Sequence, residues 1–225
     1  MKKNLVVWVL FIMLCGCSNK LDLDSKLVQD LYQQVNPSED GSILQMLYED
    51  GGLSNQYMLV VAINDYIESQ DNQVKVIFKE EVENRVASIF GDDKIVKHEI
   101  TYLLSNGYCG FEYNDKLEQY ELIPGCGGDM YQSFERKIVD AKDVDQQIII
   151  TEKSIYIYRD WDADYSHVTI YDNIEKQDKI TEFDNNPAEE LNVDIDDYLD
   201  RASTYEYTFE KVGDHYIFKG VKLVD

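Results

Sequence analysis

The spacing of apolar residues changes at Gly91, and this change limits the folds that the chain can adopt. Before Gly91, apolar residues recur every three or four positions, as in Leu27, Val28 and Leu31, which is the spacing of an amphipathic helix. After Gly91 they alternate with polar residues, which is typical of half-buried strands. Helices followed by a run of strands indicate an α+β fold. We therefore expect N-terminal helices packed on one face of a C-terminal antiparallel β-sheet.

Four helical segments are expected before Gly91, and several of their ends carry residues that favour helix termini. Serine at a helix start can accept a backbone hydrogen bond, whereas glycine and proline favour a helix end. The expected helices begin at Ser25, near Ile43, at Ser54 and at Val74, and they end at Pro37, Gly51, Ile67 and Gly91, respectively.

The second part of the chain is expected to form strands and two hairpins. We predict one α+β domain over residues 26–225, helical over 26–91 and mainly strands over 92–225. This order of elements over residues 55–225 resembles that of cystatin-like and nuclear-transport-factor-like cone folds. The expected strands cover residues 96–104, 111–113, 120–122, 134–139, 148–151, 155–158, 168–171, 205–209 and 216–218.

The N-terminus has the pattern of an export signal. Lys2 and Lys3 precede ten consecutive apolar residues that run from Leu5 to Leu14. This run is too short for a helix that spans a bilayer, which needs about 20 residues, but it fits the apolar region of a secretory signal peptide. A buried N-terminal helix would show a polar face, which this run lacks. We therefore expect residues 1–16 to be a signal peptide and the mature protein to be exported.

The sequence Leu14-Cys15-Gly16-Cys17 resembles the lipobox of bacterial lipoproteins, and the resemblance covers residues 1–17. It implies cleavage before Cys17 and acylation of the Cys17 thiol, and stable anchoring needs more than one acyl chain. The protein would then be held on the extracytoplasmic side of the cell membrane, with residues 17–25 as a lipidated tether. The alternative is an ordinary signal peptide that happens to end in cysteine.

Two cysteines lie beyond the signal, Cys109 and Cys126. An even number of cysteines in an exported protein indicates a disulfide. The alternation of residues 111–113 and 120–122 around Asn114 predicts a hairpin, which would bring the two cysteines together. We therefore expect a Cys109–Cys126 disulfide, which would stabilise the fold by roughly 3 kcal/mol. The alternative is two free thiols.

The charge of the chain argues against one class of function. It has 21 Lys and Arg against 44 Asp and Glu, and its formal net charge is −23. Nucleic-acid binding requires clustered basic residues that neutralise phosphates, and anionic lipid surfaces attract basic segments. We therefore expect no nucleic-acid partner, and membrane contact through the lipid at Cys17.

Fourteen acidic residues lie within residues 160–200, where two lysines oppose them. The segment Asp160-Trp161-Asp162-Ala163-Asp164 has the alternate oxygen ligands that Ca²⁺ favours. However, an EF-hand loop that starts there needs Gly at its sixth position and Glu at its twelfth, where Tyr165 and Tyr171 stand. We therefore expect a solvated acidic segment, with a calcium site as the alternative, and no metal or other cofactor.

The sequence does not match a known catalytic or metal-binding motif. His98, His167 and His215 do not have the spacing of zinc ligands. Gly125-Cys126-Gly127-Gly128 follows Pro124 and precedes a strand, whereas a phosphate-binding loop opens a helix. The 17 tyrosines could form a sugar-binding surface, although many fall at strand positions that favour aromatic residues anyway. We therefore assign no catalytic residue.

Two functions remain compatible with the sequence. The first is a non-catalytic, lipid-anchored envelope domain that binds a protein or a small ligand. The second is an envelope hydrolase whose active site is built from carboxylates dispersed in the sequence. A polar cluster in a concave pocket would favour the hydrolase, whereas a filled sheet without a cleft would favour the binding domain.

Overall fold

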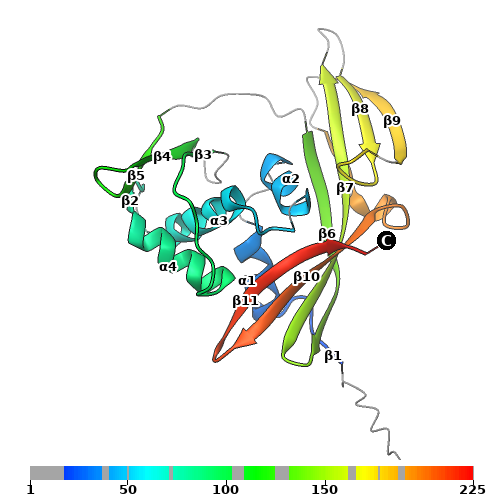
Figure 1. Cartoon of the computed structure of the whole chain (residues 1–225). Coiled ribbons are helices and arrows are strands. Elements are labelled where there is room, and N and C mark those ends of the chain that lie inside the picture. The colour runs from blue at the N-terminus through cyan, green and yellow to red at the C-terminus, as the bar shows by residue number, and fades with distance from the viewer. Residues whose placement is uncertain are drawn as a thin grey trace, which may run out of the picture.

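The structure is a computed structural model of the chain. Its four α-helices lie on one side of a large antiparallel sheet (Figure 1). The α+β fold that the change of apolar spacing predicts is therefore confirmed. The structure describes residues 18–36, 41–49, 51–70, 73–102, 109–124, 132–161, 166–176, 178–186 and 191–224.

These residues form four α-helices, one 3₁₀-helix and eleven strands. The helices are α1 (Lys26–Val35), α2 (Gly41–Glu49), α3 (Asn55–Glu68), α4 (Lys79–Phe90) and the 3₁₀-helix η1 (Ile195–Asp197). The strands are β1 (Asn19–Lys20), β2 (Val76–Phe78), β3 (Thr101–Tyr102), β4 (Gly110–Asn114), β5 (Gln119–Leu122), β6 (Gln132–Val144), β7 (Gln147–Trp161), β8 (Ser166–Tyr171), β9 (Lys179–Asn185), β10 (Ser203–Val212) and β11 (His215–Leu223).

The large sheet has seven strands and divides along β7. Its main order is β1-β6-β7-β10-β11, and β8 and β9 continue from β7. Residues 147–154 of β7 pair with β10, whereas residues 156–161 pair with β8. β7 therefore joins two parts of the sheet, only one of which continues into β10 and β11. A smaller sheet has the order β2-β5-β4-β3.

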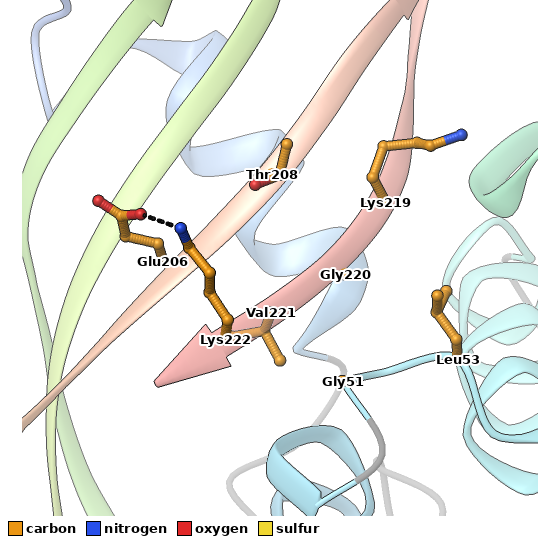
Figure 2. A pocket seen from close by; sticks show the side chains of 8 residues that line it. All are labelled: Gly51, Leu53, Glu206, Thr208, Lys219, Gly220, Val221 and Lys222. Carbon is orange, nitrogen blue, oxygen red and sulfur yellow. Dashed lines mark ion pairs between the residues drawn. The ribbon is translucent and has the colours of Figure 1, made fainter. Parts of the chain in front are cut away.

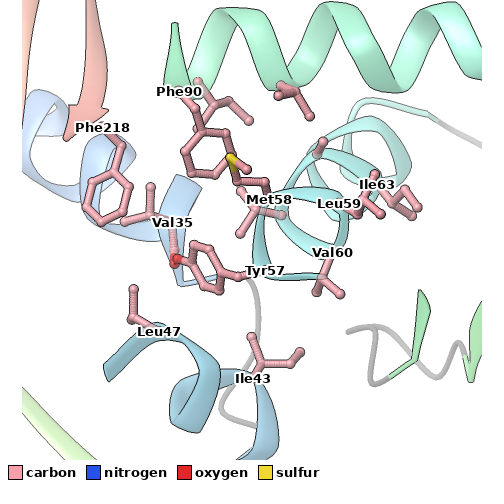
Figure 3. Packing of buried hydrophobic residues seen from close by; sticks show 14 of the residues in the cluster. Val35, Ile43, Leu47, Tyr57, Met58, Leu59, Val60, Ile63, Phe90 and Phe218 are labelled. Carbon is pink, nitrogen blue, oxygen red and sulfur yellow. The ribbon is translucent and has the colours of Figure 1, made fainter. Parts of the chain in front are cut away.

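The main hydrophobic core lies between the helices and the large sheet. Figure 3 shows Tyr57 of α3 beside Phe90 of α4 and Phe218 of β11, all of them buried. The ring centroids of Tyr57 and Phe90 are 6.2 Å apart, and those of Phe90 and Phe218 are 6.1 Å apart, in edge-to-face arrangements that aromatic rings favour. The Tyr57 hydroxyl donates a hydrogen bond to the Val35 carbonyl, so its polar atom is satisfied inside the core.

A second, smaller core covers part of the opposite face of the sheet. Because side chains alternate along a strand, Ile155 and Ile157 of β7 point away from the helices. They pack in a buried cluster with Ile195 of η1 and Ala202. The long β7 is therefore buried on both faces near this end, which explains its apolar composition.

The residues that we expected to form a tether belong to the sheet. β1 pairs with residues 142–143 of β6, and the Leu21 amide donates to the Ala141 carbonyl at 2.8 Å. Leu21 and Leu23 also pack against the main core. The expected tether over residues 17–25 is therefore wrong from Asn19 onwards, because backbone pairing and apolar burial fix this segment on β6.

Several expected helix ends are confirmed. Ser25 Oγ accepts a hydrogen bond from the Val28 amide at 3.4 Å, and Ser54 Oγ accepts one from the Tyr57 amide at 3.3 Å. Gly91 ends α4 with φ of +107°, a conformation that a side chain would disfavour.

The expected start of the fourth helix is wrong. Residues 76–78 form β2, which pairs with β5, and α4 begins at Lys79. Their Val-Ile-Phe sequence favours a strand, and an available strand partner decides between the two structures. The helical spacing of Val74, Phe78 and Val82 was therefore misleading at this end.

The expected strand over residues 96–104 is largely absent from the described residues, where only β3 is formed. Residues 103–104 lie outside them. The Asn55 side chain binds the backbone of Lys97 on both sides, through Nδ2 to the carbonyl at 2.9 Å and from the amide to Oδ1 at 2.7 Å. Gln56 Nε2 donates to the Ile100 carbonyl at 2.9 Å. Side-chain amides of α3 thus take the place of a neighbouring strand.

Both expected hairpins are confirmed. β4 pairs with β5, with Tyr113 opposite Tyr120. β10 pairs with β11 around a turn at Gly213. The strands expected separately over residues 148–151 and 155–158 are instead parts of the continuous strand β7.

Candidate functional site

A fully buried carboxylate, Glu152, lies between β7 and the helices. Its side chain is 0% exposed. Hydroxyls of Tyr32 (α1), Tyr48 (α2) and Tyr207 (β10) donate hydrogen bonds to it, Tyr48 at 2.7 Å and Tyr207 at 3.2 Å. The guanidinium of Arg136 (β6) lies 3.8 Å from the carboxylate. We call these five residues the carboxylate cluster.

Burial sets the electrostatics of the carboxylate cluster. It raises the pKa of Glu152, and Arg136 together with the tyrosine hydrogen bonds opposes this rise. Burial also raises the pKa of each of the three tyrosines well above 10, and the negative charge of Glu152 adds to this effect. An ionised carboxylate only accepts hydrogen bonds, so three neutral tyrosine donors match its needs.

The carboxylate cluster fixes the helices on the sheet. It connects α1 and α2 with β6, β7 and β10, and Arg136 also donates to Asn36 Oδ1, at the end of α1, at 2.7 Å. A catalytic carboxylate has to reach its substrate, whereas protein side chains enclose Glu152. The geometry thus supports a structural role for this acid.

Sequence reasoning missed Glu152, although the alternation along β7 carried a signal. Glu152 has the same parity as Ile148, Ile150 and Tyr156, all of which are buried on the helix side. An acid in such a row has to be paired to be buried. We treated Glu152 as a break between two strands, whereas the strand continues through it.

Three tyrosines, at the part of β7 that pairs with β8, lie within 6 Å of a lysine ammonium. Tyr156 and Tyr158 lie on β7, and Tyr171 of β8 is directly opposite Tyr156. Lys176 Nζ is 4.1 Å from the ring centre of Tyr158, 5.6 Å from that of Tyr156 and 5.9 Å from that of Tyr171. A cation within about 6 Å of a ring face is attracted by the ring. We call these three tyrosines the tyrosine cage.

The strands hold one wall of the tyrosine cage rigidly. Tyr156 is 2% exposed. Its ring lies 5.2 Å from that of Phe134 on β6, and its hydroxyl donates to Gln132 Oε1 at 2.9 Å. Tyr158 and Tyr171 are only half-buried. The cage therefore combines a fixed inner ring with two rings that solvent can reach.

The turn between β8 and β9 brings Lys176 to the tyrosine cage, and two features of this turn are energetically unfavourable. Lys176 has φ of +56°, a left-handed conformation that costs a residue other than glycine roughly 1 kcal/mol. In the same turn, Asn173 is 6% exposed, and its Oδ1 has no hydrogen-bond partner in the described part of the chain. A buried unpaired acceptor is also unfavourable. Local hydrogen bonds offset these costs, because the Lys176 amide donates to the Asn173 carbonyl at 3.2 Å and the Asp178 amide donates to Asp172 Oδ1 at 3.0 Å.

A depression between β11 and the segment that joins α2 to α3 offers little to a charged ligand. It has a volume of about 330 Å³ and is lined by Gly51, Leu53 and residues of β10 and β11 (Figure 2). Its charged groups are paired, Lys222 with Glu206 at 3.1 Å and Lys219 with Glu210 at 3.3 Å. We place the candidate site at the tyrosine cage because three aromatic rings lie within 6 Å of one cation there.

The expected lipidation site and one cysteine of the expected disulfide lie outside the described residues. Cys17 and Cys126 are outside the described residues, and Cys109 directly precedes β4. Lipidation and the Cys109–Cys126 disulfide therefore stay predictions. Within the part that is described, no helix is long and apolar enough to cross a membrane.

The acidic segment is partly built into strands. Asp160 lies in β7 opposite His167 of β8, whereas Asp162 and Asp164 are outside the described residues. Among residues with described positions, no three His, Cys, Asp or Glu side chains are grouped as metal ligands. His167 Nδ1 donates a hydrogen bond to Asp184 Oδ1 at 2.9 Å, and this bond raises the pKa of His167.

His98 lies outside a strand and is held by its neighbours. Its Nδ1 is 2.8 Å from the Tyr120 hydroxyl, its Nε2 is 3.1 Å from Glu83 Oε1, and its ring stacks on Tyr113. The expected strand over residues 96–104 is therefore wrong at His98, and these contacts are those of a packed side chain.

No known protein family, no curated protein and no solved structure matches the chain. The resemblances to lipoproteins and to cone folds therefore stay predictions, and the function has to be argued from the geometry of the site.

Proposed function

We propose that this protein is a lipid-anchored envelope protein whose mature domain binds a ligand and does not transform it. The observation that carries the binding function is the tyrosine cage, in which two half-buried rings and one buried ring face a single exposed lysine. Aromatic surfaces with accessible faces are typical of ligand sites. The lipobox Leu14-Cys15-Gly16-Cys17 supports the anchor.

The position of β1 supports an outward-facing tyrosine cage. Asn19, two residues after Cys17, pairs with Asp143, which in turn pairs with Ile148 on β7. Tyr158 lies ten residues farther along β7, or roughly 30 Å at the rise of an extended strand. A lipid at Cys17 would therefore hold the β6–β7 turn near the membrane and the cage away from it.

The alternative of a hydrolase gains little support from the carboxylate with the most perturbed surroundings. Glu152 is enclosed by Tyr32, Tyr48 and Tyr207, so a substrate could reach it only after α1 or α2 had moved. Its hydrogen-bonding capacity is used inside the protein.

The anchor is tested by labelling cells with a fatty-acid analogue and by mass spectrometry of the mature N-terminus. We expect label on the wild-type protein and on a Cys15→Ala variant, and none on Cys17→Ala. An unmodified N-terminus at another residue would show that the protein is secreted without a lipid.

The binding function is tested by thermal unfolding of the purified full chain in detergent with a panel of envelope components. We expect a compound that raises the melting temperature and is recovered unchanged. A compound that is instead consumed would support the hydrolase, and mutation of exposed carboxylates would then locate its site.

A further inference from the structure

We infer that the tyrosine cage is a binding site for an alkylated ammonium group and that Lys176 is its internal occupant. The inference rests on the proposed binding function and names the ligand class. Lys176 Nζ marks the position that the ligand nitrogen would take, within 6 Å of three ring centres.

The three rings suit an alkylated ammonium better than the lysine that occupies them. A lysine ammonium is compact and strongly hydrated, and it gives up water contacts when it lies against ring carbons. Among the described residues no ion pair involves Lys176, whereas the nearby Lys179 pairs with Glu182 at 2.7 Å. A quaternary ammonium has no N–H groups to satisfy and presents methyl groups to the rings, which is how aromatic cages recognise such cations.

Lys176 is placed so that a ligand can displace it. Its side chain is exposed, so its ammonium can leave the rings for water by rotation of the side chain alone, while the hydrogen bonds between Asp172 and Asp178 keep the turn in place. Tyr156, by contrast, is fixed by Phe134 and Gln132. Release of the lysine would therefore leave the inner wall of the cage in place.

The surroundings favour a cationic ligand over a neutral one. The net charge of the chain is −23, and the turn itself contains Asp172, Glu175 and Asp178. Such an excess of acid raises the local concentration of cations. The rings also face one point, whereas a sugar stacks its flat face on a ring. These tyrosines therefore suit a cation better than a sugar.

The experiment measures binding of tetramethylammonium to the purified full chain in detergent by NMR or tyrosine fluorescence. The neutral probe of similar shape is tert-butanol. We expect the ammonium to bind and tert-butanol not to bind. Lys176→Gln should tighten ammonium binding by about tenfold, because removal of an internal competitor raises the fraction of open cage.

Three further variants control for unrelated effects. Lys176→Arg keeps a cation in the cage and should not tighten binding, and Lys179→Gln removes a nearby lysine that pairs with Glu182 at 2.7 Å and should leave binding unchanged. Tyr158→Leu should abolish binding, and Tyr158→Phe, which keeps the ring, should retain it.

Absence of ammonium binding in both the wild type and Lys176→Gln would overturn the inference. So would equal binding of tert-butanol, or equal tightening by Lys179→Gln. Because these arms use an added probe, they can fail while the lipid anchor or another ligand from the panel is confirmed.

Discussion

The hydroxyl of Tyr48 donates a 2.7 Å hydrogen bond to Glu152 Oε1, and this bond joins α2 to the middle of β7. Tyr48 also stacks on Tyr205, with ring centroids 4.1 Å apart. The same side chain thus contributes an apolar ring to the core and a polar atom to the carboxylate cluster. Helix α2 is therefore positioned by a directional contact as well as by burial.

Replacement of Glu152 tests the carboxylate cluster. We expect Glu152→Gln to lower the free energy of unfolding by about 3 kcal/mol, because a buried Arg136 loses its counter-charge and the tyrosines lose an acceptor. Urea unfolding measures this change. Glu206→Gln, which breaks ion pairs with Lys142 and Lys222 on the other face, should cost less than about 1 kcal/mol. Equal effects of the two variants would contradict a special role of Glu152.

The buried tyrosines predict a loss of stability at alkaline pH. The pKa values of Tyr32, Tyr48, Tyr57 and Tyr207 are raised well above 10, chiefly by burial. The unfolded chain releases these protons near pH 10. Their stabilising contribution is thus complete below that pH and is lost as pH rises towards the raised pKa, by up to about 1.4 kcal/mol per pH unit for each tyrosine.

The measurement is urea unfolding from pH 8 upwards, with tyrosinate absorbance as a second signal. The slope of the unfolding free energy against pH gives the number of protons that the chain releases on unfolding. We expect this number to be smaller by about one in a Tyr207→Phe variant. A variant with an unchanged alkaline slope would show that Tyr207 ionises equally in the folded and unfolded chains.

The Asn55 side chain holds the segment before β3 in place. Its amide binds Lys97 and also donates to Glu99 Oε1 at 2.7 Å. We expect Asn55→Ala to reduce stability by about 1–2 kcal/mol and to speed hydrogen exchange of the Lys97 amide. Asn192→Ala, at an exposed position, is the matched control and should change neither quantity.

The Cys109–Cys126 disulfide is a prediction about covalent structure. Peptide mapping under non-reducing conditions should find these two cysteines linked in protein recovered from the envelope. Reduction should then lower the free energy of unfolding by roughly 3 kcal/mol, and Cys109→Ala should show the same loss. Reaction of both thiols with an alkylating reagent before reduction would argue against the bond.

The fold class and several helix ends could be predicted from the sequence, because at these places local signals agree with the tertiary structure. Ser25 and Ser54 cap helices, and Gly91 ends α4, because these effects depend on neighbouring residues. The strand β2 was missed because its pairing with β5 involves residues far away in sequence. The segment around Lys97 was assigned to a strand because an alternating pattern does not show that Asn55 would bind its backbone.

The candidate site was less accessible to sequence reasoning than the fold. The tyrosine cage depends on the register of β7 with β8, which sets Tyr156 opposite Tyr171. It also depends on the turn that returns Lys176 to the same face. The register and the turn conformation depend on the pairing of β7 with β8, so a local sequence pattern could not predict them. Glu152, by contrast, could have been found from the parity of β7.

The early start of the sheet has a consequence for shedding from the cell surface. In a protein anchored as proposed, Ser18 is the single residue between the acylated Cys17 and β1, whose residues pair with β6. Proteases cut extended, unpaired chain, and the anchor leaves almost none. Release by cleavage would therefore require β1 to separate from β6 first, so the rate of shedding would report how often this edge of the sheet opens.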